Sequence, residues 1–454
     1  MDKIQLLQQR KAEIIQASKE IREDIAKIID ENSFVELSAF SFSKNEFYGE
    51  EVAGEGVVTG FATVDGNPIY IAAQNFSVMN GGLSEAHCAK IIKCIDAAER
   101  TSTPLLYLLN THGVQVGEGI PVLEGIGKVL LRSMQLKECA PQYVVVNGEV
   151  YGAAAMLTAI ANFTFFLEKK SVLAINSPFV LSAKAGKTLA KEEIGSAAAL
   201  DKTCIPTFEV KDLTEVREKL IEISSLCDEP IIDAELNVPV VSLNEQCDAQ
   251  TLLTAFESYV ELGKSVAPDV KTVLGRIGGI SVAAVIFDSE NGVNLTATRL
   301  EKIKNFADLA GYCDLPFITF TDVKGICPCM DVNNSYVLRA IAEYLEVFQQ
   351  LNVPKISVVY KQAIGLGYSL FASKSIGFDY ACAFANAKIA LFDNVRGAKI
   401  ELCDEKADEN ALAARYADEN SDPINAAKKG YIDAIIEPQF VKQHLIASLQ
   451  MLSK

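Results

Sequence analysis

The spacing of apolar residues over positions 56–74 predicts a β-hairpin. The stretch reads GVVTGFATVDGNPIYIAAQ, with apolar runs on either side of Asp65-Gly66. An Asp-Gly pair between two such runs is a strong signal for a two-residue turn, because glycine readily adopts the positive φ that the turn requires. The first predicted element is therefore a pair of antiparallel strands.

Helical and strand-like patterns alternate after this hairpin. Ser84 suits the N-cap of a helix with Glu85 in its first turn, and Ile91, Ile92 and Ile95 form an apolar stripe at helical spacing. The elements expected next are a buried strand at 104–110, a helix at 120–136, a strand at 141–148, and a glycine- and alanine-rich turn and helix at 151–161. Strands that alternate with helices imply βαβ units around a covered, largely parallel sheet.

The second half of the chain repeats this order. The matching segments are 33–37 with 258–262, Gly60 with Gly275, Pro104 with Pro316, Pro141 with Pro354, and Gly152 with Gly365. Preserved spacing with weak identity indicates an old duplication, and the longer loop GEEVAGEG at 49–56 explains why the first pair lies further apart. We expect an α/β protein of two duplicated domains, 1–245 with an N-terminal helix and 246–454, joined by a connection near 205–260.

Composition limits the possible partners. The formal net charge is −17. Binding to nucleic acid or to an anionic membrane surface needs clustered Lys and Arg, so this acidity argues against both. The N-terminal segment MDKIQLLQQRKAEII lacks the apolar core of a signal peptide, and no stretch approaches the ~20 apolar residues of a membrane span. We expect a cytoplasmic protein with no direct membrane insertion.

Cysteine and histidine usage narrows the possible chemistry. The 11 cysteines show no CxxC spacing, and Cys327 and Cys329 only bracket a proline, so we expect no metal site and reduced, buried, structural thiols. Only three histidines occur, and His444 falls in a C-terminal helical pattern that suggests a surface position. Chemistry that depends on histidine is therefore not expected.

Glycines after two apolar strands point to a different kind of site. The segments EVYGAAA at 149–155 and QAIGLGY at 362–368 each end a strand and open a helix. The first N–H groups of a helix lack intrahelical acceptors, and small residues let a ligand oxygen approach them closely. Backbone amides can form an oxyanion hole in this way. Tight packing of a helix on a sheet is the alternative explanation.

Several motifs resemble one known family. Residues 74–87, QNFSVMNGGLSEAH, are similar to the Q-D-F-T-V-x-G-G-S-L-S-E-x-H segment of the carboxyltransferase subunits of biotin-dependent acyl-CoA carboxylases and decarboxylases. Four further segments resemble family motifs in the same order, namely GEGVVTG at 54–60, GRIGG at 275–279, DVKG at 322–325 and the closing residues 422–438. The resemblance covers roughly residues 30 to 450.

This resemblance implies a fold, an activity and partners. The fold would be two tandem ClpP/crotonase-like ββα-superhelix domains. The activity would move a carboxyl group between carboxybiotin on a carrier protein and the α-carbon of a coenzyme A thioester, with one oxyanion hole in each domain and no catalytic histidine. The partners would be a biotin carboxyl carrier protein and either biotin carboxylase or a membrane decarboxylase subunit. The site would lie between two subunits, so a homo-oligomer, dimer or hexamer, is expected.

Site residues follow from matching the motifs position by position. The first hole falls on Gly152 and Ala153, and the second on Gly365, Leu366 and Gly367. The family's D-S-G-G-A-R-I-Q-E-G falls on residues 110–119. The residues expected to bind acyl-CoA or biotin are Thr111, His112, Gly113, Val114, Gln115, Gly81, Gly82 and Tyr368.

The chain departs from the family at several of these positions. His112 and Leu366 replace glycines and Gln115 replaces an arginine, while Asn75 replaces an aspartate and Ala340 a histidine next to the retained Arg339. Backbone amides survive such changes, so the holes are expected to remain while the acyl pocket changes shape. His112 could reach an acyl carboxylate or act as a spacer at a widened turn.

These departures leave two rivals to the carboxyltransferase. One is a non-catalytic homologue that serves as a scaffold for an active subunit. The other is a crotonase-type acyl-CoA hydratase or hydrolase that works without biotin. That chemistry would need an acid or base in the pocket, and the sequence offers Glu118, Glu149 and His112.

Overall fold

The predicted hairpin is present in the computed structural model, which describes residues 2–41, 53–226, 233–244, 246–333, 336–401 and 408–452. Strands β2 (Val57–Val64) and β3 (Asn67–Gln74) pair antiparallel, and Val64 lies opposite Asn67 across the turn. Asp65 and Gly66 both have positive φ, 50° and 79°. Such values are typical of the type I′ turn that an Asp-Gly pair favours.

The first of two structural units, Met1–Ile223, is built on a mixed sheet. The strand order is β1-β2-β3-β4-β5-β6-β8, with β7 paired to β5; β1–β3 run antiparallel and the pairs from β3 onward are parallel. The other strands are β1 (Val35–Leu37), β4 (Leu105–Thr111), β5 (Gln142–Tyr151), β6 (Phe163–Leu167), β7 (Val172–Ala174) and β8 (Phe208–Val210). The expected largely parallel sheet is confirmed.

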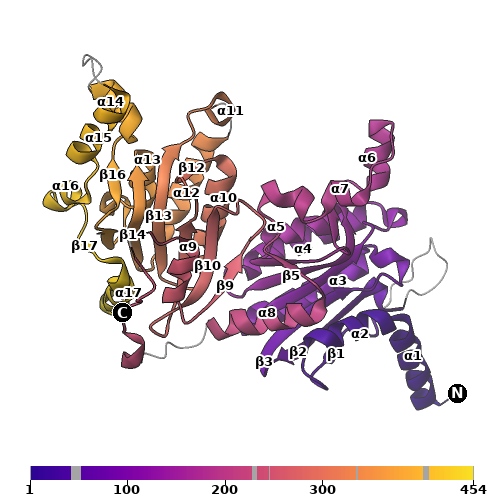
Figure 1. The fold of residues 1–454 in the computed structure, drawn as a ribbon. Coiled ribbons are helices and arrows are strands. Elements are labelled where there is room, and N and C mark those ends of the chain that lie inside the picture. Colours follow the sequence, from indigo (N-terminus) through magenta and orange to yellow (C-terminus); the bar gives the residue numbers. More distant parts are fainter. Residues whose placement is uncertain are drawn as a thin grey trace. The chain divides into compact units, whose positions relative to one another are not determined.

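Helices cover the first sheet (Figure 1). The helix predicted at 120–136 is α4 (Ile120–Leu136), and it packs with α3 (Glu85–Thr101) in one buried apolar cluster with the strands. The Ser84 side chain accepts a hydrogen bond from the N–H of His87, so the predicted N-cap is confirmed. The remaining helices are α1 (Lys3–Ala17), α2 (Lys19–Ile28), α5 (Met156–Ile160), α6 (Pro178–Ala185), α7 (Lys191–Gly195) and α8 (Leu213–Leu226).

The second unit, Ser224–Lys454, repeats the topology of the first. Its strand order is β9-β10-β11-β13-β14-β15-β17, with β12 paired to β13 and β16 to β14. The strands are β9 (Ser258–Leu262), β10 (Val270–Ile277), β11 (Ile280–Phe287), β12 (Val293–Leu295), β13 (Phe317–Ile326), β14 (Lys355–Ile364), β15 (Tyr380–Phe384), β16 (Lys388–Ala390) and β17 (Ala434–Ile436). The internal duplication is therefore visible in the order and direction of the strands.

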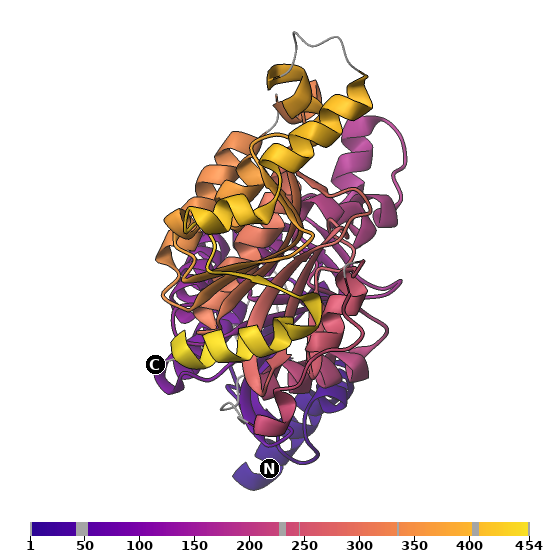
Figure 2. The ribbon, with the colours of Figure 1, turned by 60° about the vertical axis from the view of Figure 1, so that its left-hand side comes forward.

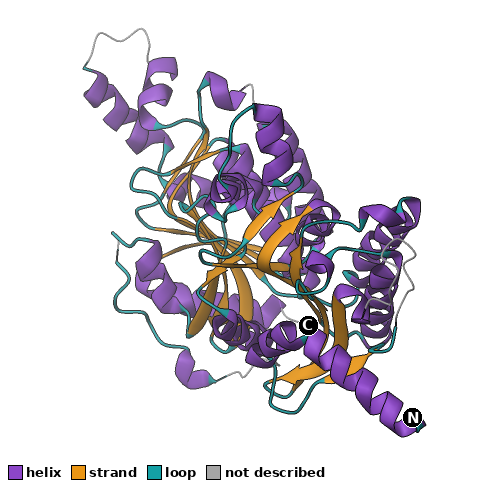
Figure 3. Cartoon of the chain, turned by 90° about the vertical axis from the view of Figure 1, so that its right-hand side faces the viewer, coloured by secondary structure: helices purple, strands orange, loops and turns teal. Residues whose placement is uncertain are grey.

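Helices also flank the second sheet, as Figure 3 shows for each unit. They are α9 (Ala249–Leu252), α10 (Ala297–Tyr312), α11 (Met330–Asn333), α12 (Val337–Gln350), α13 (Leu366–Phe371), α14 (Asn394–Glu401), α15 (Glu409–Asn420), α16 (Pro423–Lys428) and α17 (Val441–Leu452). Helix α17, yellow in Figure 2, packs on the strands of its own unit through buried Leu445 and Leu449. In the described ranges, no helix is both long and apolar enough to cross a membrane.

Strand register corrects one match of the predicted repeat. Val64 lies opposite Asn67 across the first hairpin turn, and Ile277 lies opposite Ile280 across the second. When β2 and β10 are aligned on these turns, Gly60 corresponds to Val273 and not to Gly275. The match of 33–37 with 258–262 is confirmed, because Gly60 pairs with Glu36 and Val273 with Glu261. The spacing of this pair was explained by the longer loop at 49–56, and residues 49–52 of that loop lie outside the described residues.

Gly60 and Gly275 nevertheless meet the same physical requirement, although they lie two positions apart in the aligned strands. A Cβ on Gly60 would lie 2.5 Å from the carbonyl oxygen of Val35, and one on Gly275 would lie 2.7 Å from that of Ser258. Each glycine thus allows the edge strand of its sheet to approach closely. This shared need explains why the two residues resembled equivalent positions.

The expected connection near 205–260 is shorter in the structure. Strand β8 belongs to the first sheet and β9 to the second, so both ends of that range are parts of the folded units. The structural division falls between Ile223 and Ser224, and Leu243 already lies in the core of the second unit. The domain limits 1–245 and 246–454 stay a prediction.

The cysteine prediction is partly wrong. Cys88, Cys94, Cys247 and Cys382 are buried, but Cys139 and Cys329 are exposed, and all the described cysteines are free thiols. Cys327 and Cys329 lie with their sulfur atoms 3.1 Å apart. No group of three or more metal-ligating side chains occurs among the described residues.

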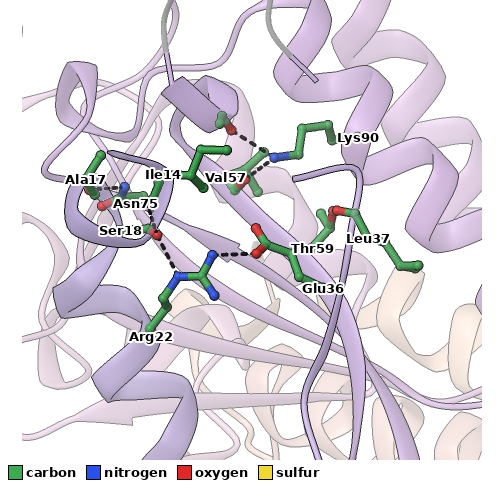
Figure 4. A network of polar contacts seen from close by, with 11 residues as sticks. Ile14, Ala17, Ser18, Arg22, Glu36, Leu37, Val57, Thr59, Asn75 and Lys90 are labelled. Carbon is green, nitrogen blue, oxygen red and sulfur yellow. Dashed lines mark hydrogen bonds and ion pairs between the residues drawn. The ribbon is translucent and has the colours of Figure 1, made fainter. Parts of the chain in front are cut away.

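A buried lysine supports the start of each hairpin. In the first unit, Lys90 donates hydrogen bonds to the carbonyls of Gly54 and Val57, as Figure 4 shows for Val57. In the second, Lys302 donates to the carbonyls of Gly263, Val266 and Val270. Val57 and Val270 are the first residues of β2 and β10. The sequence analysis missed both lysines, because lysine is rarely buried without partners that only the fold reveals.

Candidate active site

The first predicted oxyanion turn lies where β5 ends. Gly152 follows Tyr151 with φ +77°, a conformation that favours glycine, and begins a short 3₁₀ helix, η4 (Gly152–Ala155). The N–H of Gly152 donates to the carbonyl oxygen of Ile175 at 3.1 Å. The N–H of Ala153 stands at the start of the helix, and no acceptor for it occurs among the described residues. The donor available at this turn is therefore the amide of Ala153.

The second predicted turn repeats this arrangement where β14 ends. Gly365 has φ +54°, and its N–H donates to the carbonyl oxygen of Ala390 at 2.9 Å. Helix α13 then begins at Leu366, and the N–H of Tyr368 already bonds back to Gly365. Within the described part of the chain, the N–H groups of Leu366 and Gly367 have no acceptor. This turn therefore offers two amide donors.

The two glycines and their neighbours have different roles. Gly152 and Gly365 supply the backbone conformation, while Ala153, Leu366 and Gly367 supply the N–H groups. Gly367 must also be small, because a Cβ there would lie 2.6 Å from Cγ1 of Val323. The side chain that departs from the family, Leu366, is 46% exposed and so does not occupy the core.

Predicted binding residues of the first unit lie together beside Gly152. Leu83 exchanges hydrogen bonds with this segment, donating to Gly113 at 2.9 Å and accepting from Gln115 at 2.8 Å. The Gln115 side chain also donates to the carbonyl of Gly82 at 3.3 Å. Gly113 has φ +122°, and its Cα lies 3.8 Å from the point that a Cβ on Gly152 would occupy. The segment at 110–119 thus packs against the first turn, and the motif at 74–87 packs against that segment.

The other predicted residues of this segment have structural contacts. Thr111 is buried, and its hydroxyl accepts from the N–H of Gly113 at 3.1 Å. Gly81 has φ +63°, and a Cβ on it would lie 2.1 Å from the carbonyl oxygen of Asn110, so only glycine fits. Val114 is 37% exposed and forms an isolated bridge with Leu83.

A polar cluster lies next to this first turn. Glu149 accepts hydrogen bonds from the Tyr151 hydroxyl at 2.9 Å and from Nζ of Lys191 at 2.7 Å, and its other contact is Nε2 of His112 at 3.4 Å. Burial raises the pKa of Glu149, but the hydrogen bonds from Lys191 and Tyr151 outweigh burial and leave this pKa below its usual value. The cluster contains two of the acid or base candidates, His112 and Glu149. Glu118 instead accepts from the N–H of Glu85 at 2.7 Å, and burial raises the pKa of its carboxyl.

The sequence analysis missed Lys191 and the role of Tyr151. Tyr151 lies in the segment 149–155, and its alternation with Glu149 along a strand places both side chains on one face. Lys191 begins α7, some 40 residues after the turn in the chain (191 − 152 = 39), and no motif marked it.

A buried carboxylate lies near the second turn. The side chain of Asp322 is fully buried, and Oδ1 accepts from the side-chain amide of Gln362 at 2.9 Å. Nζ of Lys361 lies 3.8 Å from Oδ2, which has no hydrogen-bond partner among the described residues. Burial raises the pKa of Asp322 above its usual value, against the smaller opposing effects of Gln362 and Lys361. Tyr368, the predicted binding residue of this unit, is half-buried, and burial raises the pKa of its hydroxyl.

The remaining departures have structural roles. Asn75 is buried and donates to the carbonyl of Ala17 at 2.8 Å, so it fastens α1 to the first unit (Figure 4). Ala340 is buried in α12, while the exposed Arg339 pairs with Glu343 at 3.2 Å.

The predicted surface position of His444 is wrong. His444 is partly buried, with Nδ1 at 3.2 Å from the Tyr380 hydroxyl.

Comparisons with known proteins place the chain in a family. A family model described as carboxyl transferase domain matches residues 14–454. The chain is 28% identical to methylmalonyl-CoA decarboxylase subunit alpha of Veillonella parvula, over 95% of this chain and 89% of that protein. It is 27% identical to propionyl-CoA carboxylase beta chain of Saccharopolyspora erythraea, over 95% of this chain and 87% of that one.

The fold comparison gives the same result. The crystal structure of transcarboxylase 12S, a hexamer with methylmalonyl-CoA bound, matches with a TM-score of 0.90 over 99% of this chain and 95% of that chain, at 24% identity. This similarity confirms the predicted tandem crotonase-like fold.

Proposed function

Because the chain belongs to the carboxyl transferase domain family, we propose that it moves a carboxyl group between carboxybiotin on a carrier protein and the α-carbon of an acyl-CoA. The family match over residues 14–454 and relatives named for acyl-CoA carboxylase and decarboxylase subunits support this function. The acyl group and the direction of transfer are not part of the proposal.

One observation carries the proposal. Each unit ends a central parallel strand in a positive-φ glycine. The amides that follow, at Ala153 in one unit and at Leu366 and Gly367 in the other, have no acceptor among the described residues. Donors fixed in this way stabilise negative charge that develops on a carbonyl oxygen without reorganising. Packing of a helix on a sheet would also leave these first N–H groups without intrahelical acceptors, so the turnover of variants at Ala153 and Leu366 distinguishes the two explanations.

The residues of the chain would divide the chemistry between two reactants. Carboxybiotin supplies or receives the carboxyl group when it is bound. We propose that the Ala153 amide holds the thioester oxygen of the acyl-CoA, since the segment 110–119 packs beside it. The amides of Leu366 and Gly367 would hold the second carbonyl oxygen. No histidine is needed for this carboxyl transfer itself.

The relatives are subunits of larger assemblies, and we propose the same for this chain. A biotin carboxyl carrier protein would deliver biotin, with either biotin carboxylase or a membrane decarboxylase subunit as a further partner. Self-association into a dimer or hexamer is part of the proposal, and the hexamer named for transcarboxylase 12S supports it. A cytoplasmic location remains a prediction.

Decarboxylation assays test the proposal against its rivals. The protein is incubated with biotin or a biotinylated carrier and with malonyl-, methylmalonyl- or glutaconyl-CoA, and loss of the substrate carboxylate is followed by mass spectrometry. We expect biotin-dependent turnover of at least one thioester. Turnover that needs no biotin would favour a crotonase-type hydrolase, and no turnover with any thioester would favour the scaffold.

A further inference from the structure

Four side chains from three segments converge beside the first turn. His112 follows β4, Glu149 and Tyr151 lie on β5, and Lys191 begins α7. Glu149 is the shared partner, at 2.7 Å from Lys191, 2.9 Å from the Tyr151 hydroxyl and 3.4 Å from Nε2 of His112. The proposed carboxyl transfer uses none of these side chains, so their convergence needs a separate explanation.

Glu149 is held as an anion facing the imidazole. Lys191 and the Tyr151 hydroxyl both donate to it, and these bonds leave the pKa of Glu149 below its usual value despite burial. A carboxylate beside one ring nitrogen favours the tautomer that carries its proton on that nitrogen. With the proton on Nε2, Nδ1 of His112 keeps its lone pair and can accept a proton.

The imidazole is also fixed in place. Its ring lies edge-on to Phe76, with centroids 4.9 Å apart, and tilted against Tyr151 at 5.6 Å. The backbone N–H of His112 donates to the carbonyl of Asn80 at 3.2 Å. The side chain remains 45% exposed, so a ligand can reach it. A mere spacer in a widened turn would not require contacts with two aromatic rings and at a ring nitrogen.

The ring lies close to the proposed oxyanion donor. Tyr151, which contacts the ring, is followed directly by Gly152 and Ala153. Gly113, the next residue after His112, has its Cα 3.8 Å from the Cβ position of Gly152. The segment that carries His112 therefore packs against the turn that carries the Ala153 amide.

We propose that His112, positioned by Glu149, transfers a proton to and from the carbon next to the thioester carbonyl, without biotin. The C–H bond breaks, its proton passes to Nδ1, and its electron pair forms an enolate whose oxygen accepts a hydrogen bond from the Ala153 amide. The reverse step returns a proton that has exchanged with solvent. No oxidant or further reactant is required. The inference takes from the proposed function only that an acyl thioester binds at Ala153.

Hydrogen–deuterium exchange tests this activity directly. Acetyl-, propionyl- and butyryl-CoA are incubated with the protein in D₂O without biotin, and the signal of the protons next to the carbonyl is followed by NMR. We expect the wild type to exchange these protons of at least one thioester faster than solution without protein. His112→Gly should lower the rate about 100-fold, as general acid–base catalysis typically contributes 10²–10⁴-fold. Added imidazole should restore part of the lost rate.

Two further variants separate proton transfer from folding. His112→Asn keeps a polar side chain of similar size but no base, so it should lose exchange as His112→Gly does while melting at the wild-type temperature. Glu149→Gln should lower the rate without rescue by imidazole, because the positioning carboxylate and not the base is lost. His444→Gln, on α17 of the other unit, is the matched control and should exchange like the wild type.

The outcomes distinguish this inference from the proposed function. Absence of exchange by the wild type, or wild-type rates in both His112 variants, would overturn the inference. Biotin-dependent decarboxylation without such exchange would leave the proposed function standing alone. Exchange without any biotin-dependent turnover would support the inference and contradict the proposed function.

Discussion

The ammonium group of Lys90 donates a hydrogen bond of 2.6 Å to the carbonyl oxygen of Val57, the first residue of β2. Its counterpart in the other unit, Lys302, donates to Val270, the first residue of β10, also at 2.6 Å. Both lysines are buried. The duplicated fold has thus kept a buried lysine at the first residue of each hairpin, where it donates to the backbone carbonyl.

Substitution of Lys90 should change how stability depends on pH. Burial lowers the pKa of Lys90 from 10.5 to about 8. Between these values the unfolded chain binds a proton at Lys90 that the folded chain does not, so the wild type should gain stability as pH rises through this window. Lys90→Met should lack the gain, which amounts to at most about 3 kcal/mol for a shift of this size. Urea unfolding at pH 7.5, 8.5 and 9.5 measures the free energy of unfolding of the wild type and of Lys90→Met.

The exposed Lys128, on α4, provides the control. Lys128→Met should show the same pH dependence as the wild type over these three conditions, because Lys128 is not among the charges that shift the pKa of Lys90. A wild-type stability that falls relative to Lys90→Met as pH rises would contradict the prediction.

Local elements could be predicted because their signals are local. The Asp65-Gly66 turn, the N-cap Ser84 and the limits of α4 at 120–136 all follow from neighbouring residues, and all are present. The repeat was also visible, since spacing survives when identity does not. The match of Gly60 with Gly275 was wrong because each hairpin has a glycine where its edge strand approaches closely, but the two glycines lie at different register positions.

The site was only partly predictable for the same reason. The glycine turns at Gly152 and Gly365 were found, but their own N–H groups donate to Ile175 and Ala390, which lie in later strands or loops. Which amide remains available depends on those long-range bonds. Lys191 likewise reaches Glu149 only through the fold. Sequence patterns therefore located the turns, and tertiary hydrogen bonds decide which atoms act.

Ala153→Pro should remove the proposed donor of the first hole. Proline has no N–H, and loss of one oxyanion donor typically lowers turnover 10²–10³-fold. Ala153→Gly, which keeps the N–H, is the matched control and should retain activity within a few fold. Biotin-dependent decarboxylation measures both variants, with melting temperature as the check on folding. Equal activity of the two variants would show that the Ala153 amide is not a donor.

Gly152→Pro is expected to act differently from Ala153→Pro. Proline fixes φ near −65°, whereas Gly152 has φ +77° and donates to Ile175. The substitution should therefore destabilise the turn itself and lower the melting temperature of the protein. A Gly152→Pro protein that melts like the wild type would contradict the role of this glycine as the conformational element of the hole.

Leu366→Pro tests the second hole with less disturbance than a change at Gly367. Leu366 is the first residue of α13, a position that proline tolerates well, and its side chain is largely exposed. Gly367→Pro would instead place ring atoms against Val323. We expect Leu366→Pro to lower turnover at least tenfold, since Gly367 still offers a donor, and Leu366→Ala to remain active. Comparable turnover of the two variants would exclude the Leu366 amide.

Asp322→Asn should stabilise the protein at neutral pH. Burial raises the pKa of Asp322, so the folded chain holds a proton there more readily than the unfolded chain does, and wild-type stability falls as pH rises through the folded pKa. Asparagine keeps an acceptor for Gln362 without a buried charge. The melting temperature of the variant should therefore exceed that of the wild type at pH 7, by a margin that shrinks at pH 4. Asp331→Asn, at an exposed position, is the control and should not change the melting temperature at either pH. A wild type that melts above Asp322→Asn at pH 7 would mean that the 3.8 Å contact of Asp322 with Lys361 outweighs desolvation.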